Sequence, residues 1–217
     1  MSQEVKIIFG IIVVTVLLLV GGIFLVNRNS SNQTNENVLA TTEMSRLVRE
    51  DSIIIATKSA TTTIVEFADF QCPACAAAQP LLDELLTTYQ GKVNYVYRHL
   101  PLPQHKHAML AAESSEAAKV QGKFLEMQQL LYSRQTQWAS AEDAKVLFVE
   151  YAKELRLDTE SFTKAIDEKQ AEGKILRDVS DAQALKVSAT PTFYINGQMI
   201  QGVPDKTEFQ RIIEGTK

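Results

Sequence analysis

The two cysteines of this 217-residue chain stand close together, in the segment from Cys72 to Cys75. Residues 61–67, just before them, are rich in β-branched and aromatic side chains, which predicts a strand. Residues 73–89 carry alanine and leucine at helical spacing, and residues 93–98 have the composition of a second strand. A strand, a helix and a second strand form the βαβ unit of a parallel pair. The cysteines are therefore expected where the first strand passes into its helix.

The position of the two cysteines favours a chemically reactive pair over a disulfide that stabilises the fold. A disulfide between Cys72 and Cys75 closes a very short loop, and the chain-entropy model gives such a loop little stabilisation. At a helix N-terminus, free N–H groups and the positive end of the helix dipole stabilise a thiolate. We therefore predict that Cys72, at the cap, is the more exposed and more acidic nucleophile. Cys75, on the same side of the first turn, is predicted to be the resolving thiol.

Half of a zinc site is the alternative interpretation of this cysteine pair. A Cys-x-x-Cys pair with two histidines satisfies zinc, and His99, His105 and His107 are available. The spacing of His105 and His107 suits a loop or a helix start better than a ligand pair. We expect all three histidines to be structural or surface groups and predict no metal site. A tethered metal-binding or chaperone-like module is the alternative from a different functional class.

Residues 7–26 form an uncharged, mostly apolar run of 20 residues. A helix of that length spans about 30 Å, which is the thickness of a bilayer core. We predict a single transmembrane anchor at 7–26, preceded by a short cytoplasmic N-terminus at 1–6; a cleaved signal peptide is the alternative. Residues 27–44, rich in Asn, Ser and Thr, are expected to form a flexible linker. One domain of ordinary size is expected over 45–217.

A long helical region is predicted between the second strand and the C-terminal part of the chain. Residues from about 106 to 187 carry Ala, Glu, Lys, Gln and Leu in amphipathic spacing. Ser140 with Asp143 predicts an N-terminal capping box for a helix that runs to about Leu155. Asp158 is expected to cap the helix after it.

The C-terminal part of the chain predicts a hairpin and a short helix. Residues 192–201 are divided by Asn196-Gly197, which is the strongest two-residue signal for a hairpin turn. Residues 205–214 are expected to form the last helix. Within the first predicted helix, Pro80 is expected to interrupt the hydrogen bonding and to introduce a kink.

Three blocks of the sequence resemble the DsbA-type branch of the thioredoxin superfamily, and they fall in that family's order. The similarity covers about residues 46–217. It implies an α/β thioredoxin fold with an inserted helical subdomain at about 106–187, and an enzyme, a protein disulfide oxidoreductase without a separate cofactor. The blocks are Glu-Phe-Ala-Asp-Phe-Gln-Cys-Pro-Ala-Cys at 66–75, Tyr-Arg-His-Leu-Pro-Leu at 97–102 and Ala-Thr-Pro-Thr-Phe at 189–193.

Carried over by position, the resemblance makes Cys72 the attacking cysteine and Cys75 the resolving one. It makes Thr190 and Pro191 the cis-proline loop, whose backbone can pair with an extended substrate peptide; from the pattern alone, an ordinary trans proline at a strand start is favoured. Glu66 matches the family's buried carboxylate, which has a raised pKa and relays the proton of Cys75. The pattern alone leaves an exposed strand residue equally open.

The residues beside the cysteines set the expected redox behaviour. Pro73 and Ala74, between the cysteines, are grouped with Thr190 and Pro191 as expected substrate contacts. The strongly oxidising members carry histidine where this chain has Ala74, and Thr190 resembles the isomerase-like and reducing branches. We therefore expect a moderately oxidising or intermediate reduction potential. The alternative to disulfide donation is a reductase or isomerase that acts from the dithiol form.

Composition and compartment complete the functional hypothesis. The net charge of −4 argues against a nucleic-acid partner. The expected partners are reduced protein substrates and, as the family implies, a quinone-linked membrane protein as reoxidant.

Lys6 and Arg28, on either side of residues 7–26, leave the membrane orientation open. A disulfide donor belongs outside the reducing cytoplasm, so we expect a single-pass membrane protein whose catalytic domain is extracytoplasmic.

Overall fold

The computed structural model describes residues 43–55 and 60–215. The predicted N-terminus at 1–6, the anchor at 7–26 and all but the last two residues of the predicted linker lie outside this part of the chain. Residues 43–47 are helical. Within the described residues, no helix combines the length and the apolar character that a membrane crossing requires. The chain divides after Ser45, and the fold described below is that of the unit Arg46–Lys217.

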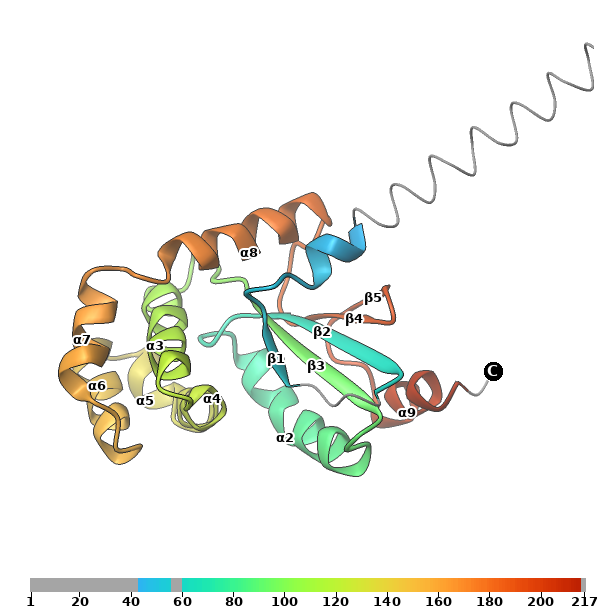
Figure 1. The fold of residues 1–217 in the computed structure, drawn as a ribbon, viewed down its shortest axis with the longest axis horizontal. Coiled ribbons are helices and arrows are strands. Elements are labelled where there is room, and N and C mark those ends of the chain that lie inside the picture. Colours follow the sequence, from blue (N-terminus) through green and yellow to red (C-terminus); the bar gives the residue numbers. More distant parts are fainter. Residues whose placement is uncertain (1–42, 56–59, 216–217) are drawn as a thin grey trace, which may run out of the picture. The chain divides into compact units, whose positions relative to one another are not determined.

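A sheet of five strands, counted over the described residues, forms the centre of this unit (Figure 1). Its order is β1-β3-β2-β4-β5. β2 and β3 run parallel, whereas β1, β4 and β5 are each antiparallel to their neighbours. The parallel pair confirms the predicted βαβ unit. The strands are β1 (Ile53–Ile55), β2 (Thr62–Ala68), β3 (Val93–His99), β4 (Thr192–Ile195) and β5 (Gln198–Gln201).

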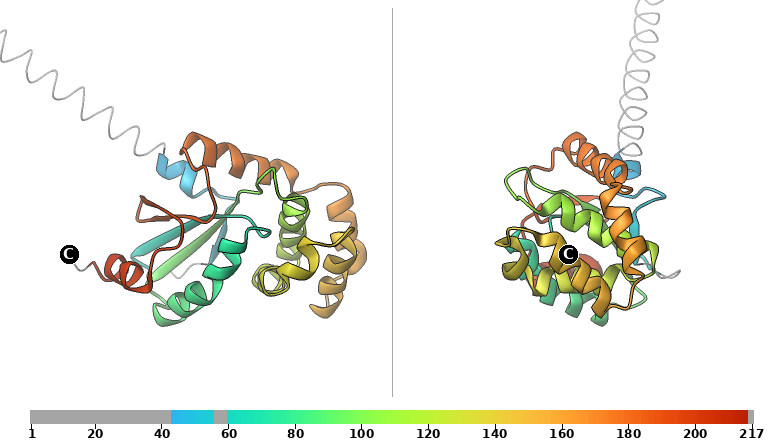
Figure 2. Two further views of the ribbon diagram at one scale, coloured as in Figure 1. Left: turned by 180° about the vertical axis from the view of Figure 1, so that it is seen from behind. Right: turned by 90° about the vertical axis from the view of Figure 1, so that its left-hand side faces the viewer.

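Helices cover both faces of the sheet, and successive residues of β2 point to opposite faces. On one face Ile64 belongs to a cluster that includes residues of α2 (Pro73–Thr88) and α9 (Lys206–Glu214). On the other face Val65 and Phe67 pack with residues of α8 (Glu172–Ala184). Both further views agree that α2 and α8 lie on opposite sides of the sheet (Figure 2). Strand alternation therefore directs every second β2 side chain toward α2.

Six helices connect β3 to β4, in a stretch that the structure describes throughout, and those from α3 to α7 gather at one end of the sheet (Figure 1). This arrangement is the helical insertion that the sequence predicted. Trp138 is fully buried within it and packs edge-on against Phe148. Besides α8, the inserted helices are α3 (Ala108–Val120), α4 (Phe124–Ser133), α5 (Gln135–Ala139), α6 (Ala144–Glu154) and α7 (Thr159–Asp167).

One predicted helix cap is wrong and another is confirmed. Asp143, rather than Ser140, caps α6, where its carboxylate accepts the N–H of Lys145. The Ser140 hydroxyl instead donates to the Thr136 carbonyl in the preceding helix, because Ser140 ends that helix and lies too early to cap the next. Asp158 caps α7 as predicted.

The predicted hairpin is confirmed, and the predicted helix continues on both sides of Pro80. Asn196 and Gly197 both have positive φ, which is the geometry of a type I′ turn between β4 and β5. α2 runs through Pro80 as one helix. Ala78 and Leu82, before and after the proline, are both buried in the same core. Their packing holds the two halves in one element.

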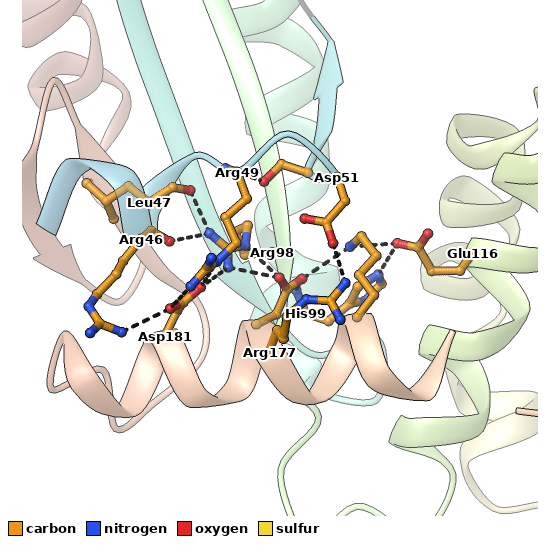
Figure 3. A network of polar contacts seen from close by, with 12 residues as sticks. Arg46, Leu47, Arg49, Asp51, Arg98, His99, Glu116, Arg177 and Asp181 are labelled. Atoms are coloured by element: carbon orange, nitrogen blue, oxygen red, sulfur yellow. Dashed lines mark hydrogen bonds and ion pairs between the residues drawn. The ribbon is translucent and has the colours of Figure 1, made fainter. Parts of the chain in front are cut away.

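A buried arginine joins β3 to α8 and to the segment before β1 (Figure 3). The Arg98 side chain is fully buried, and its Nε donates to Asp178 Oδ1 at 2.8 Å. A second nitrogen donates to Asp181 Oδ2 at 2.7 Å, and the third donates to the carbonyls of Arg46 and Leu47. One guanidinium thus satisfies two buried carboxylates and two backbone carbonyls.

Further charged groups extend this network toward the insertion (Figure 3). Lys174 of α8 lies 2.8 Å from Glu116 of α3 and 3.3 Å from Asp178. Glu116 also lies 3.0 Å from Nε2 of His99, at the end of β3. The network therefore connects α8 and α3 to β3, which carries Arg98 and His99.

We predict that Arg98→Met lowers the free energy of unfolding by about 3–5 kcal/mol, because it removes the fully buried counter-charge that Asp178 and Asp181 share and leaves two backbone carbonyls without this donor. Urea denaturation followed by circular dichroism measures the change. Arg177→Met is the matched control, since Arg177 pairs with Asp51 at an exposed position and such pairs contribute at most about 1 kcal/mol. Equal losses in the two variants would contradict the assignment.

Candidate active site

The turn between β2 and α2 is fixed by the buried side chain of Asp69. Its Oδ1 accepts the N–H of Gln71 at 2.7 Å, and its Oδ2 accepts the N–H of Leu102 at 2.9 Å. Oδ2 also lies 2.6 Å from Nδ1 of His105. The Asp69 carbonyl accepts the N–H of Cys72 at 3.0 Å. The turn therefore places Cys72 at the N-cap of α2 in a defined orientation.

Cys72 and Cys75 are both free thiols in a largely enclosed site. Cys72 retains 7% of its surface, whereas Cys75 has none. The Cys72 sulfur lies 3.3 Å from the carbonyl oxygen of Thr190, to which the thiol donates. Only Cys72 is placed to meet a molecule from outside, and Pro73 and Ala74 beside it are exposed.

The two sulfurs differ strongly in acidity. The pKa of Cys72 is lowered to about 5, chiefly by a hydrogen bond from the Cys75 side chain, with further help from the N–H groups of Cys75 and Ala74. Burial opposes this shift. The pKa of Cys75 is raised far above its ordinary range, first by burial and then by its bond to Cys72 and the charge of Glu66. The pKa of Cys72 is lowered, as expected for a cysteine at a helix N-cap. The largest contribution to this shift nevertheless comes from Cys75.

Glu66 is fully buried in β2, on the face of the sheet that carries α2. The hydroxyl of Tyr95 donates to its Oε2, whereas Oε1 has no hydrogen-bond partner among the described residues. Burial raises the pKa of Glu66 to about 7. The alternative of an exposed strand residue is therefore wrong, because the helical layer covers this face of β2.

The loop before β4 lies against the reactive sulfur. The peptide bond between Thr190 and Pro191 is cis, so the alternative of a trans proline is wrong. Pro191 is buried, and its carbonyl accepts the N–H of Gly202 at 2.9 Å. The structure thus brings Thr190 to Cys72 from a position 118 residues later in the chain.

The three histidines bond to other groups. His99 pairs with Glu116, His105 with Asp69, and Nε2 of His107 lies 2.8 Å from the Ala141 carbonyl. Over the residues that the structure describes, no group of three or more His, Cys, Asp or Glu side chains is arranged to hold a metal ion.

Two residues that support this site were missed by the sequence analysis. Asp69 organises the turn, and Gln135 of α5 donates to carbonyls of the same turn. Asp69 lies inside the first block that carries the family resemblance, so its position was available as a signal. Gln135 lies more than 60 residues away, and no local pattern marks it.

We predict that Cys75→Ala raises the pKa of Cys72 by about one unit or more, because the largest stabilising hydrogen bond to its thiolate disappears. Cys75→Ser is the matched control, since its hydroxyl keeps a donor at the same place. The rate of alkylation by iodoacetamide as a function of pH, measured on the reduced full chain, gives the pKa. The same midpoint in both variants would refute the role of the Cys75 hydrogen bond.

We predict that Glu66→Gln becomes more stable relative to the unmutated chain as the pH rises from about 4.5 to 7. In this window the folded chain keeps the Glu66 proton and the unfolded chain releases it, so the carboxyl lowers stability progressively. The shift corresponds to roughly 3 kcal/mol. Urea denaturation at a series of pH values measures the difference in the free energy of unfolding between the variant and the unmutated chain. Because both chains contain Cys72, the contribution of its titration cancels to first order. A pH-independent difference would disprove the raised pKa.

Comparison with known proteins places these features in a family. Residues 49–215 match the family model described as Thioredoxin. The chain is 42% identical over 146 residues to a Na(+)/H(+) antiporter NhaA 3 of Salinispora tropica, which covers 67% of this chain and 22% of that protein. It is 35% identical over 155 residues to a Na(+)/H(+) antiporter NhaA of Herminiimonas arsenicoxydans, covering 71% and 24%. The chain thus spans less than a quarter of the length of these curated relatives.

Solved structures share the fold. α-DsbA1 from Wolbachia pipientis is 22% identical, with a TM-score of 0.71, covering 80% of this chain and 94% of that one. Oxidised BdbD from Bacillus subtilis is also 22% identical, with a TM-score of 0.66, covering 76% and 91%. A thioredoxin-like oxidoreductase from Silicibacter pomeroyi is 23% identical, with a TM-score of 0.68, covering 79% and 95%. The chain belongs to the thioredoxin family, and its fold is that of DsbA-type thiol–disulfide oxidoreductases.

Proposed function

We propose that this chain is a protein thiol–disulfide oxidoreductase that donates a Cys72–Cys75 disulfide to reduced protein substrates. The observation that carries the proposal is the different placement of the two cysteines: Cys72 keeps some exposed surface at the N-cap of α2, and Cys75 is fully buried in the first turn. Cys72 forms a thiolate near pH 5 at the mouth of the site, while Cys75 stays a buried thiol that donates to it. A structural disulfide needs no such difference.

In the proposed reaction, a substrate thiolate attacks the sulfur of Cys72 in the disulfide. The Cys72–Cys75 bond breaks, a mixed disulfide forms, and Cys75 leaves as a thiolate and takes up a proton. A second thiolate of the substrate then attacks the substrate sulfur of the mixed disulfide, and Cys72 leaves as a thiolate. The substrate loses two electrons and gains a disulfide, and the chain is left as the dithiol.

The acidity of Cys72 supports donation as the direction. A thiolate stabilised to a pKa of about 5 is a good leaving group, and its stability favours the reduced form of the pair. A reduced form that is stabilised in this way makes the disulfide an oxidant. Reduction or isomerisation of substrate disulfides is the reverse use of the same pair, and it requires a supply of dithiol.

Glu66 is proposed to exchange the proton of Cys75. A carboxyl with a pKa of about 7 changes protonation readily near neutral pH, which suits a proton relay. Its charge reaches Cys75, where it raises the pKa of the thiol. When Cys75 leaves as a thiolate in the enclosed site, a protonated Glu66 can neutralise it.

Substrate contact is proposed at the surface around Cys72. Pro73 and Ala74, which follow the reactive cysteine, are exposed, and the carbonyl of Thr190 lies against its sulfur. An extended peptide can pair with backbone groups of such a loop, which binds many sequences because main-chain groups supply the contacts. This arrangement suits an enzyme that meets many unfolded proteins.

The site of action is proposed to be the extracytoplasmic face of a membrane. The apolar residues 7–26 support a single anchor, and a disulfide donor persists in an oxidising compartment. A quinone-linked membrane protein is the proposed reoxidant. Retention of the full chain in membranes washed with alkaline carbonate would support the anchor, and release into the wash would oppose it.

We predict that the full chain accelerates disulfide formation in a reduced, unfolded test protein, and that Cys72→Ser abolishes this activity because the Cys72–Cys75 disulfide that the substrate thiolate attacks can no longer form. In Cys75→Ser, the Cys72 thiolate can attack a disulfide of the oxidised test protein, whose other sulfur leaves as a thiolate, and the resulting mixed disulfide cannot be resolved internally. Non-reducing gel electrophoresis should show a covalent complex with the test protein, and dithiothreitol should separate its two components by reducing the mixed disulfide. Full activity of the Cys72→Ser variant would show that the site is wrongly assigned.

We predict that the pair is mainly disulfide in cells, because a donor must be kept oxidised. Rapid acid quenching followed by a thiol alkylator that adds mass measures the redox state. The reduction potential, from equilibration with glutathione, should lie above that of thioredoxin, which is about −270 mV. A mainly dithiol protein with a potential as low as thioredoxin would favour the reductase.

A further inference from the structure

The side-chain amide of Gln135 connects the inserted helices to the backbone of the reactive turn. Gln135, at the start of α5, keeps only 7% of its surface. Its Nε2 donates to the Phe70 carbonyl at 2.7 Å and to the Cys72 carbonyl at 2.9 Å. One side chain from the insertion therefore bridges two carbonyls that lie two residues apart, the second of which belongs to the reactive cysteine.

The Cys72 carbonyl is also the first acceptor of α2. It accepts the N–H of Ala76 at 3.2 Å, which begins the hydrogen bonding of the helix. The peptide plane that follows Cys72 is thus held by the helix and by Gln135 together. The orientation of this plane sets where the first-turn N–H groups of Ala74 and Cys75 point, and these groups donate to the Cys72 sulfur.

A second contact links the same turn to the insertion. The Gln71 Oε1 accepts the N–H of His107 at 2.7 Å, and its Nε2 lies 3.4 Å from the Ala139 carbonyl. Both bonds are made by the Gln71 side chain. The carbonyls of Phe70 and Cys72, on either side of Gln71, accept hydrogen bonds from Gln135 instead. Of these two glutamines, Gln135 is the one whose side chain bonds to the backbone of Cys72.

We propose that Gln135 is a positioning residue for thiol–disulfide exchange, through which the helical insertion holds Cys72 against the first turn of α2. The inference rests on the proposed function, since it assigns Gln135 a role in the reactivity of the same thiol. It excludes a role that is limited to filling space, because the amide directs both of its hydrogen bonds at the turn.

Gln135→Met tests the inference, because methionine keeps a similar length and volume but donates no hydrogen bond. Gln137→Met is the matched control: Gln137 lies in the same helix, is exposed and undergoes the same chemical change. The two readouts are the pH midpoint of Cys72 alkylation by iodoacetamide and the equilibrium of the full chain with glutathione. Circular dichroism verifies that each variant is folded.

We expect the midpoint of Gln135→Met to rise by about one unit, which is a tenfold smaller thiolate population at pH values below the midpoint. The glutathione equilibrium should move toward the disulfide by a similar factor, because the reduced form loses stabilisation. Gln137→Met should match the unmutated chain in both measurements.

A folded Gln135→Met chain with an unchanged midpoint and an unchanged glutathione equilibrium would overturn the inference. If that variant does not fold, Gln135→Asn, which keeps the amide but is one methylene shorter, takes its place: a raised midpoint supports the inference and an unchanged one overturns it. If Cys72 of the unmutated chain reacts like an ordinary thiol, the proposed function fails first and the inference fails with it.

Discussion

The hydrogen bond from the buried Cys75 thiol to the Cys72 sulfur is the interaction on which the chemistry of this protein depends. It is the largest contribution to the low pKa of Cys72, and it exists because the first turn of α2 places residues 72 and 75 on one side. Burial keeps Cys75 protonated, so that it can donate. The same enclosed environment that suppresses ionisation of one sulfur therefore promotes ionisation of the other.

The rest of the fold maintains that environment. Alternation along β2 directs Glu66 to the face that α2 covers, where burial raises its pKa to about 7. The insertion contacts the turn before Cys72 through the amide of Gln135. Arg98 in turn secures β3 to α8 from the opposite face. Each of these groups holds a polar or charged atom out of water, so each needs its partners in place.

Local sequence signals predicted the elements of this structure well. Strand composition, the Asn196-Gly197 turn and the cap at Asp158 depend on neighbours within a few residues, and the structure confirms them. The cap assigned to Ser140 was wrong because two closely spaced helices compete for the residues between them. Burial of Glu66 and the contact of Gln135 arise between distant segments, which no local pattern encodes.

By itself the sequence determined the strand, helix and strand unit, the placement of both cysteines at its junction and, through three separated blocks, the family. These depend on backbone preferences and spacing, which act over short distances. The tertiary structure decided how strongly the two sulfurs differ in acidity, whether Glu66 is buried and what holds Cys72 in place. Those properties follow from burial and from hydrogen bonds between residues far apart in the chain, and they exist only when the sheet and its helical layers enclose the site.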